Sequence, residues 1–348
     1  MDLDNIEQVR RADPEGALEV ISTSAEQLKF QPELHNFSNH RKITNIVLSG
    51  MGGSCLAGLI IKDWLDLDYN FATPFEITRD YQVPAYVNEH SLVICVSVSG
   101  NTEETISSLN DAIAKSAQVV IVTSGGKLLD IAKQNHLPYA QLDKISQPRY
   151  GVPMHLRVIT SILAKYQLVN NQPFDELAGS YNVVNKFANS LTANISTDHN
   201  PAKQLALDCV GKTVLTYSSS QFYPLAYKWK TSFNENAKNT VWCNEFPEFN
   251  HNEFIGWTSH PIEKPFCVIN LRSNLDNPRI NRRFDLTERL LSGNRPAAHN
   301  IILTGDSYIQ QVLCGAIMGD ITSIYLGLIN GVDPTPVGLV EKFKKELE

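Results

Sequence analysis

The sequence of 348 residues has few cysteines, no excess of positive charge and no long hydrophobic run, and each absence argues against a class of protein. Its six cysteines are widely scattered and form no CxxC pair, which argues against a zinc site and against a disulfide framework. A formal net charge of −7 offers no basic face for DNA or RNA. No uninterrupted apolar run approaches the roughly 20 residues that span a bilayer. We therefore expect a protein that binds neither nucleic acid nor membrane.

The remaining composition is typical of a globular protein with sizeable cores, since 43% of the residues are hydrophobic and 19% are charged. The first residues, "MDLDNIEQVRRADPEG", lack the basic start and apolar stretch of a secretory signal. A cytoplasmic location and reduced thiols are therefore expected. Cys55 and Cys95 flank glycine- and serine-rich loops, and we interpret both as small buried hydrophobes rather than nucleophiles.

The first half of the chain has the rhythm of a parallel α/β sheet. An amphipathic stretch, "ALEVISTSAEQLKF", predicts an early helix. Short β-branched segments that end in Gly, Ser, Thr or Asp then alternate with helical patterns: "TNIVLSGMGGS", "SLVICVSVSGNT", "QVVIVTSGG" and "LPYAQLD". A helical pattern from Pro153 to about Val169 closes this half. Continuous apolar strands separated by helices indicate a sheet that is covered on both faces.

A second α/β series follows, with strand candidates "GKTVLTYSS", "NTVWCNEF", "FCVINLR" and "HNIILTG". We place the domain boundary near residues 170–185 and expect two doubly wound domains, 1–175 and 176–348, each with a mainly parallel sheet flanked by helices. The final segment, "TPVGLVEKFKKELE", predicts a terminal helix with Thr335 as its N-cap and Pro336 in its first position.

Two loops of the first half carry hydroxyls at predicted strand ends. "VSVSGNTEET" places Ser97, Ser99 and Thr102 between a buried strand and a helix start, and "SGMGGS" adds Gly53 and Ser54. Free amides and hydroxyls at helix starts suit a phosphate dianion, although the same residues are also ordinary turn and N-cap residues. The loops match neither the GxGxxG dinucleotide pattern nor a Walker loop.

These loops resemble those of the sugar isomerase (SIS) fold. "QPRYG", "WKTSFNENAK", "FPEFNHNEFIGW" and "GVDPTPVGLVEKFKKEL" resemble the bifunctional phosphoglucose/phosphomannose isomerase family, in order along both halves. The resemblance implies two SIS-type domains and an aldose–ketose isomerase for glucose 6-phosphate, fructose 6-phosphate and also mannose 6-phosphate. It implies that Gly53, Ser54, Ser97, Ser99 and Thr102 bind the substrate phosphate.

The resemblance also assigns catalytic roles. Glu235, in "NENAK", is the base that moves a proton between C1 and C2, although periodicity alone would make it a solvated residue at a helix end. His251, in "FNHNE", assists ring opening, because its reference pKa near 6.5 makes both protonation states available. Arg149, in "QPRYG", stabilises negative charge on the enediolate.

Lys344 is the C-terminal lysine that reaches the sugar ring, with Lys342 and Lys345 as alternatives; from the sequence alone all three are a solvated cationic helix end. The family needs no metal and no cofactor. It implies a homodimer with the active site near the interface, in which His251 acts in its own or the partner subunit. Two other functions stay open at this point: a non-catalytic phosphosugar sensor, and an isomerase of another sugar phosphate.

Overall fold

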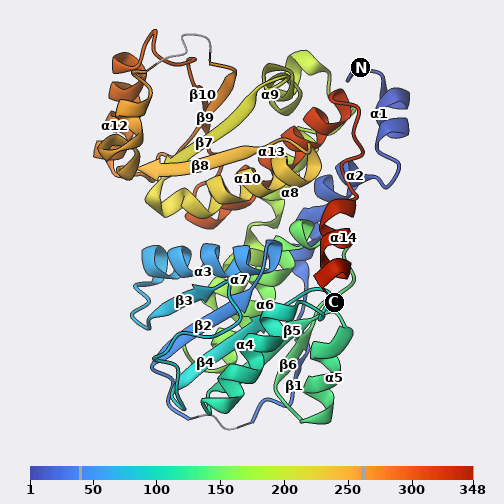
Figure 1. Ribbon diagram of the computed structural model, residues 1–348, viewed down its shortest axis with the longest axis vertical. Coiled ribbons are helices and arrows are strands. Elements are labelled where there is room, and N and C mark those ends of the chain that lie inside the picture. Colours follow the sequence, from blue (N-terminus) through green and yellow to red (C-terminus); the bar gives the residue numbers. More distant parts are fainter. Residues whose placement is uncertain (39–40, 260–263, 348) are drawn as a thin grey trace. The chain divides into compact units, whose positions relative to one another are not determined.

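The computed structural model describes residues 1–38, 41–259 and 264–347, which form two compact units (Figure 1). The N-terminal unit is Ser24–Asn182, and the C-terminal unit is Val183–Glu348 together with Met1–Thr23. The first 23 residues belong to the C-terminal unit, whereas the predicted domains 1–175 and 176–348 place them with the first half of the chain. They are held by the C-terminal unit, where Lys203 Nζ donates to Leu3 O at 2.8 Å and α2 packs against α13.

The sheet of the N-terminal unit has six strands in the order β1-β6-β5-β4-β2-β3, with only the β1–β6 pair antiparallel among the described residues. Two strands were not predicted, β1 and β3, which lie at the two edges of this sheet. The strands are β1 (Leu34–His35), β2 (Asn45–Gly50), β3 (Phe75–Thr78), β4 (Ser91–Val96), β5 (Gln118–Thr123) and β6 (Tyr139–Gln141).

Helices cover both faces of this sheet. Val47, Val93 and Ile121 pack with Leu109 of α4 and Leu128 of α5 in one buried cluster. Leu48 points to the opposite face, where Gly58 lets α3 approach closely. The helices are η1 (Ser24–Lys29), α3 (Gly53–Tyr69), α4 (Glu103–Ala114), α5 (Gly126–Gln134), η2 (Pro148–Tyr150), α6 (Val152–Lys165) and α7 (Gln172–Gly179); α8 (Tyr181–Asn189) crosses the boundary.

The sheet of the C-terminal unit has four parallel strands in the order β10-β9-β7-β8. Leu215 and Val268 contribute to one buried cluster with Phe284 of α12, and Thr216 faces α10 on the other side. All four strands were predicted. The strands are β7 (Thr213–Ser219), β8 (Val241–Phe246), β9 (Phe266–Arg272) and β10 (His299–Ile302).

The helices of the C-terminal unit include α13. By length and composition α13 could cross a membrane, but it is almost entirely buried within the protein, as is typical of a core helix. The helices are α1 (Ile6–Ala12), α2 (Ala17–Ser22), η3 (Thr197–His199), α9 (Pro201–Asp208), η4 (Ser220–Phe222), α10 (Tyr223–Asn236), η5 (Glu248–His251), α11 (Glu253–Gly256), α12 (Pro278–Leu290), α13 (Tyr308–Ile329) and α14 (Gly338–Leu347).

Two helix predictions were wrong in detail. The stretch 17–30 is not one helix, because the hydroxyls of Ser22 and Thr23 both donate to Glu19 O at 2.9 Å and compete with the helical hydrogen bonds. The last helix starts at Gly338, so Thr335 is not its N-cap. Thr335 instead belongs to a preceding turn, in which its N–H donates to Asp333 Oδ1 at 2.9 Å.

Candidate active site

The two predicted phosphate loops start at the same edge of the N-terminal sheet. Strands β2 and β4 are parallel neighbours, and Gly50 is aligned with Val96, the last residue of β4. The loops that follow therefore leave the sheet side by side at its carboxyl end, where open α/β sheets bind ligands. Residues 97–102 lead into α4, which begins at Glu103 with Thr102 as its N-cap.

The loop from Ser97 to Thr102 is a preformed turn that is rich in donors. The hydroxyls of Ser97 and Thr102 are 2.8 Å apart, and Ser97 Oγ accepts the N–H of Gly100 at 3.1 Å. Ser97 is only 2% exposed, whereas Ser99 is exposed and accepts the N–H of Asn101 at 3.3 Å. The turn holds its hydroxyls at the amino end of α4, where the helix dipole favours an anion.

A third loop, which follows β5, braces this turn. Lys127 N donates to Asn101 Oδ1 at 3.0 Å, and Leu128 N donates to Gly100 O at 2.9 Å. Gly100 and Gly126 both have positive φ, and a side chain at either position would overlap the facing loop. The sequence analysis assigned no role to Asn101, Gly100 or Gly126. The two adjacent glycines of "VTSGG", together with Asn101 in the preceding loop, could have indicated that the two loops are in contact.

Gly53 lies against the backbone of the segment around Arg149. A Cβ atom at Gly53 would lie 3.0 Å from Pro148 O and 3.0 Å from Arg149 Cα, so its missing side chain admits this chain's own backbone. Ser54, in the first turn of α3, is buried, and its N–H donates to Met51 O at 3.0 Å. The α3 start and the Arg149 segment are thereby brought together.

Arg149 lies in the short helix η2 and is 2% exposed. Its Nη1 donates to Gln147 Oε1 at 3.0 Å, and its guanidinium lies 4.7 Å from the ring centroid of Tyr150. Gln27 supports the segment by donating to Tyr150 O at 2.9 Å. A buried guanidinium with defined neighbours is more suited to a preorganised site than the surface arginine that the sequence left open.

His155 holds the turn that follows Arg149. The ring is fully buried in α6, and Nδ1 lies 2.6 Å from Gly151 O, to which the protonated nitrogen donates. Burial lowers the pKa of His155 to about 4, because the imidazolium would lose its hydration. The ring is therefore neutral at physiological pH and acts as a structural support.

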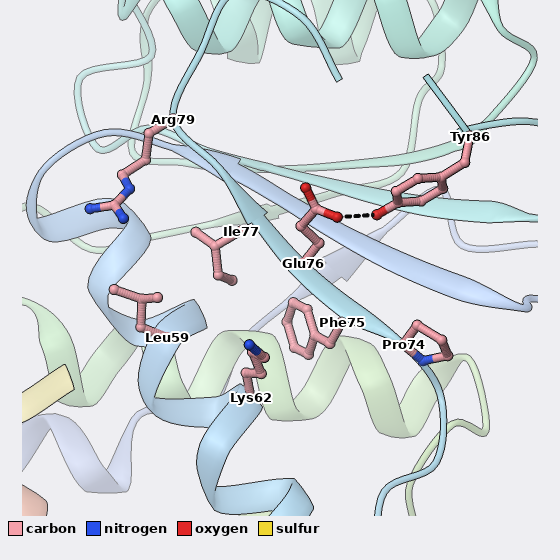
Figure 2. Close-up of a pocket in the computed structure, with 8 residues that line it drawn as sticks. All are labelled: Leu59, Lys62, Pro74, Phe75, Glu76, Ile77, Arg79 and Tyr86. Atoms are coloured by element: carbon pink, nitrogen blue, oxygen red, sulfur yellow. Dashed lines mark hydrogen bonds between the residues drawn. The ribbon is translucent and has the colours of Figure 1, made fainter. Parts of the chain in front are cut away.

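A cavity of about 410 Å³ lies elsewhere on the N-terminal unit, along the edge strand β3 and beside α3 (Figure 2). Lys62 and Arg79 contribute its cationic side chains, and Tyr86 donates to Glu76 Oε2 at 2.8 Å. None of the predicted phosphate-binding residues lines this cavity. The loops at the carboxyl ends of β2 and β4 therefore remain the candidate phosphate site.

In the C-terminal unit, Glu235 lies in the last turn of α10 and is half-buried. The apolar residues that predicted this helix, including Leu225, Trp229 and Phe233, are fully buried. Glycines of α13 let the two helices approach closely: a Cβ atom at Gly319 would lie 2.6 Å from Trp229. The packing of α10 on α13 fixes the helix end that carries Glu235.

Buried polar contacts lock the same two helices in register. Lys228 Nζ and Asp320 Oδ1 form an ion pair at 2.6 Å, and Ser232 Oγ donates to the same oxygen at 2.6 Å. Asn236, the residue after Glu235, donates to Ser323 Oγ at 2.9 Å. A helix held by several buried contacts orients Glu235 with little freedom.

The loop 246–254 is anchored as its phenylalanines predicted. Phe246 and Phe249 are fully buried, and Phe254 packs against the same cluster. Glu253 accepts hydrogen bonds from Tyr217 and, at 2.7 Å, from Asn244 Nδ2. His251 ends η5 and is exposed, so the loop presents an accessible imidazole on a rigid base.

Lys344 lies on α14 with Lys342 and Lys345, and all three side chains are exposed. Lys342 is 3.6 Å from Glu346 across one helical turn. The predicted residues are thus divided between the units: Gly53, Ser54, Ser97, Ser99, Thr102 and Arg149 lie in the N-terminal unit, and Glu235, His251 and Lys344 lie in the C-terminal unit.

Comparison with known families now defines the class. The SIS domain profile matches residues 41–163, which include all the predicted phosphate-binding residues and Arg149. The profile of the bacterial phospho-glucose isomerase C-terminal SIS domain matches residues 198–347, which include Glu235, His251 and Lys344. The chain is therefore a protein with two SIS domains, and the expected fold class is confirmed.

Full-length relatives define the family within this class. The chain is 30% identical to the bifunctional phosphoglucose/phosphomannose isomerase of Aquifex aeolicus, over 87% of this chain and 90% of that protein. It is 31% identical to the enzyme of the same name from Caldicellulosiruptor bescii, over 88% and 90% of the two chains. The chain belongs to the family of bifunctional phosphoglucose/phosphomannose isomerases.

Two further similarities bear on the fold and on alternatives. A glucose-6-phosphate isomerase like protein from Thermus thermophilus has the same fold, with a TM-score of 0.66, 18% identity and 99% of each chain covered. The chain is also 30% identical to the D-glucosamine-6-phosphate 4-epimerase of Sulfolobus acidocaldarius, over 62% of this chain and 64% of that protein. This second match covers less of both chains than the isomerase matches do.

Proposed function

We propose that this protein interconverts glucose 6-phosphate and fructose 6-phosphate, and also mannose 6-phosphate, by proton transfer through an enediolate. The observation that carries this proposal is the family membership over nearly nine tenths of the chain. The residues agree with it, because a donor-rich turn suited to phosphate and a glutamate on a helix held by buried contacts are both present.

The phosphate is bound by the hydroxyls of Ser97, Ser99, Thr102 and Ser54, together with N–H groups at the start of α4. No cation is needed for this task, since hydroxyls and helix-start amides donate directly to the phosphate oxygens. Gly53 contributes indirectly, because its missing side chain lets the Arg149 segment approach the start of α3.

Glu235 removes the proton from C2 of the aldose and returns it to C1, and the reverse path forms the aldose from the ketose. A glutamate carboxylate can accept a proton from carbon in one step and return it in the next. Arg149 stabilises the negative charge that develops on the enediolate oxygen. His251 and Lys344 open the sugar ring by moving a proton between the ring oxygen and a hydroxyl. The reaction uses no metal and no cofactor.

The protein is proposed to act in the cytoplasm as a homodimer with its active site near the interface. The loop that carries His251 supports this arrangement, because Ile255, four residues later, is 70% exposed. An exposed isoleucine beside a catalytic loop is an expected feature of a protein interface. Sedimentation analysis of wild type and of Ile255→Asp tests this directly, with a shift from dimer toward monomer expected for the variant.

A coupled assay tests the proposed reaction. Purified, EDTA-treated protein is given fructose 6-phosphate, and glucose 6-phosphate and mannose 6-phosphate are followed separately. Formation of both products is expected. Formation of glucose 6-phosphate alone would restrict the activity to one epimer, and absence of both would contradict the proposal.

The similarity to a D-glucosamine-6-phosphate 4-epimerase names a particular substrate for the alternative in which the protein acts on another sugar phosphate. D-Glucosamine 6-phosphate is therefore assayed in parallel for conversion to its C4 epimer. Turnover of the amino sugar with none of fructose 6-phosphate would favour that reaction instead. Binding of phosphosugars without any turnover would favour a sensor.

A further inference from the structure

Two cysteines outside the proposed catalytic residues are in direct contact. Cys209 directly follows α9, and Cys267 is the second residue of β9. Their sulfur atoms are 3.2 Å apart, and the residues are 0% and 2% exposed, respectively. A disulfide has an S–S distance of about 2.0 Å, so a movement of roughly 1 Å would join them. Neither residue belongs to the motifs that define the family resemblance.

A histidine and a carboxylate complete this cluster. His299 is the first residue of β10, which pairs with β9, and its imidazole lies near enough to the Cys267 thiol for the two groups to influence each other's pKa. His299 Nδ1 also lies 3.7 Å from Asp208 Oδ2. The His299 imidazole is thus a base beside the Cys267 thiol, and the Cys209 thiol lies on that same sulfur. This is the arrangement that activates a cysteine nucleophile.

The charges around the pair favour a thiolate on Cys267. The S–H of Cys209 donates to Cys267 and, with His299 and Lys212, lowers the Cys267 pKa, whereas burial opposes this shift. The same interaction and burial raise the pKa of Cys209. Contact with Cys267 also raises the pKa of His299, despite its partial burial and the positive charge of Lys212. The protonated imidazole and the thiolate therefore stabilise each other.

The pair lies close to the surface. Val210, the next residue after Cys209, is 42% exposed, and the His299 side chain is 36% exposed. Gly211 and Lys212, which continue this turn, are exposed as well. A small oxidant needs to displace only a turn at the end of α9 to reach the sulfurs, rather than to unfold a core.

We propose that Cys209 and Cys267 are a peroxide-sensitive thiol pair that oxidises reversibly to a disulfide. The Cys267 thiolate attacks one oxygen of hydrogen peroxide, the O–O bond breaks, and the leaving hydroxide takes the proton of His299 to form water. The resulting sulfenic acid is attacked by the Cys209 sulfur; the S–O bond breaks, and the departing hydroxide takes the Cys209 proton. Two thiols and one peroxide thus give one disulfide and two waters.

A metal site is the main structural alternative for a cluster of cysteine, histidine and aspartate. Across residues 1–38, 41–259 and 264–347, no group of three or more such side chains is arranged to hold a metal ion. The direct contact between the Cys209 and Cys267 sulfurs is instead typical of two thiols that can form a disulfide. The other four cysteines provide an internal comparison, because burial raises the thiol pKa of Cys55, Cys95, Cys243 and Cys314.

Peroxide titration of the full-length protein tests this proposal. After treatment near neutral pH, the protein is denatured, its free thiols are alkylated, and its peptides are mapped by mass spectrometry. We expect a link between the Cys209 and Cys267 peptides, four thiols left from the original six, and complete recovery with dithiothreitol. Oxidation of other cysteines first, or of Cys267 to irreversible acids without a link, would overturn the proposal, as would no loss of thiols.

Variants separate the roles of the two cysteines. Cys209→Ser should stop at a Cys267 sulfenic acid that dimedone traps, whereas Cys267→Ser should lose the reaction. His299→Asn should slow oxidation at pH 7 by about twofold or more, because a smaller fraction of Cys267 is then thiolate. Cys314→Ser, a buried cysteine far along the chain, is the matched control and should react like wild type. An unchanged rate in His299→Asn would remove the histidine from the mechanism.

This proposal is independent of the isomerase activity. Cys267 lies at the amino end of β9, whereas the loop 246–254 follows the carboxyl end of the parallel strand β8. Thiol mapping reports on the pair even if the protein acts on another sugar phosphate.

Discussion

Gly53 lies against the backbone of Arg149, with room for no side chain between them: a Cβ atom would come 3.0 Å from the Arg149 Cα atom. This contact joins the end of the first phosphate loop, where α3 begins, to the proposed enediolate-stabilising arginine. Because the opposing atoms are backbone, they move only if η2 moves. The packing therefore couples the position of Arg149 to the identity of residue 53.

Gly53→Ala should lower both stability and turnover. Overpacking against backbone destabilises a protein by about 1–3 kcal/mol, and displacement of Arg149 should reduce kcat. Urea unfolding and the coupled assay measure the two effects. Gly179→Ala is the matched control, since nothing lies within 4 Å of its Cβ position at the end of α7, and its stability should stay within about 1 kcal/mol of wild type. Equal behaviour of the two variants would contradict the packing argument.

Ser97→Ala and Thr102→Val should each weaken substrate binding. Each removes a hydroxyl from the proposed phosphate site, and a hydrogen bond to a charged group contributes about 1.5–3 kcal/mol, or roughly 10–100-fold in KM. Because the two hydroxyls are 2.8 Å apart, the effects in the double variant should be less than additive. Additive effects would argue that the hydroxyls do not share one ligand.

Glu235→Gln should abolish most turnover while substrate binding persists. Loss of a general base costs about 10²–10⁴-fold in rate, and the amide keeps the size of the side chain. Steady-state kinetics and phosphosugar binding are measured together. Glu19→Gln, at an exposed glutamate of α2 in the same unit, should behave like wild type. Turnover within tenfold of wild type in Glu235→Gln would assign the base to another residue.

Asp320→Asn should strongly destabilise the C-terminal unit. It leaves the buried ammonium of Lys228 without its charged partner, a loss that costs about 3–5 kcal/mol. Glu7→Gln removes one partner of an exposed ion pair with Arg11 and should change stability by less than about 1 kcal/mol. Thermal unfolding compares the two, and a small effect at Asp320 would mean that α10 is held by apolar packing alone.

His155 should make the protein less stable in acid. Its folded-state pKa of about 4 lies below the ordinary value, so the unfolded state binds a proton more readily. The resulting stability is present above about pH 6.5, is lost as the pH falls toward 4, and amounts to about 3 kcal/mol. His155→Asn keeps a donor for Gly151 O but does not titrate, so its unfolding free energy should depend less on pH in this window. His136→Asn, at an exposed histidine, should keep the wild-type slope.

Strong hydrophobic periodicity made most of the fold predictable. The apolar runs that form β2, β4, β5, β7 and β9 are continuous because parallel strands are buried on both faces. β3 was missed because an edge strand needs less apolar sequence, and its pattern "FEIT" places only Phe75 and Thr78 in buried positions. The break after Ser22 was missed because hydroxyl-to-backbone competition leaves the helical pattern intact.

The site was less accessible to sequence reasoning. Hydroxyls at strand ends indicated the loop from Ser97 to Thr102, but the bracing contacts of Asn101 and Gly126 depend on tertiary packing. The burial of Arg149 also depends on packing. The contact between Cys209 and Cys267 joins residues that are 58 positions apart, and no local pattern signals it.

Solvent isotope exchange tests the central claim most directly. EDTA-treated wild type and Glu235→Gln are incubated with fructose 6-phosphate in deuterium oxide until the wild-type products reach equilibrium, and proton NMR follows position C2 of the aldoses. The proton that Glu235 carries can exchange with solvent while the enediolate is bound, so repeated turnover predicts deuterium at C2 of both glucose 6-phosphate and mannose 6-phosphate with wild type. Glu235→Gln should give little product. Products that reach equilibrium without deuterium at C2, or full exchange in Glu235→Gln, would contradict the proposed mechanism.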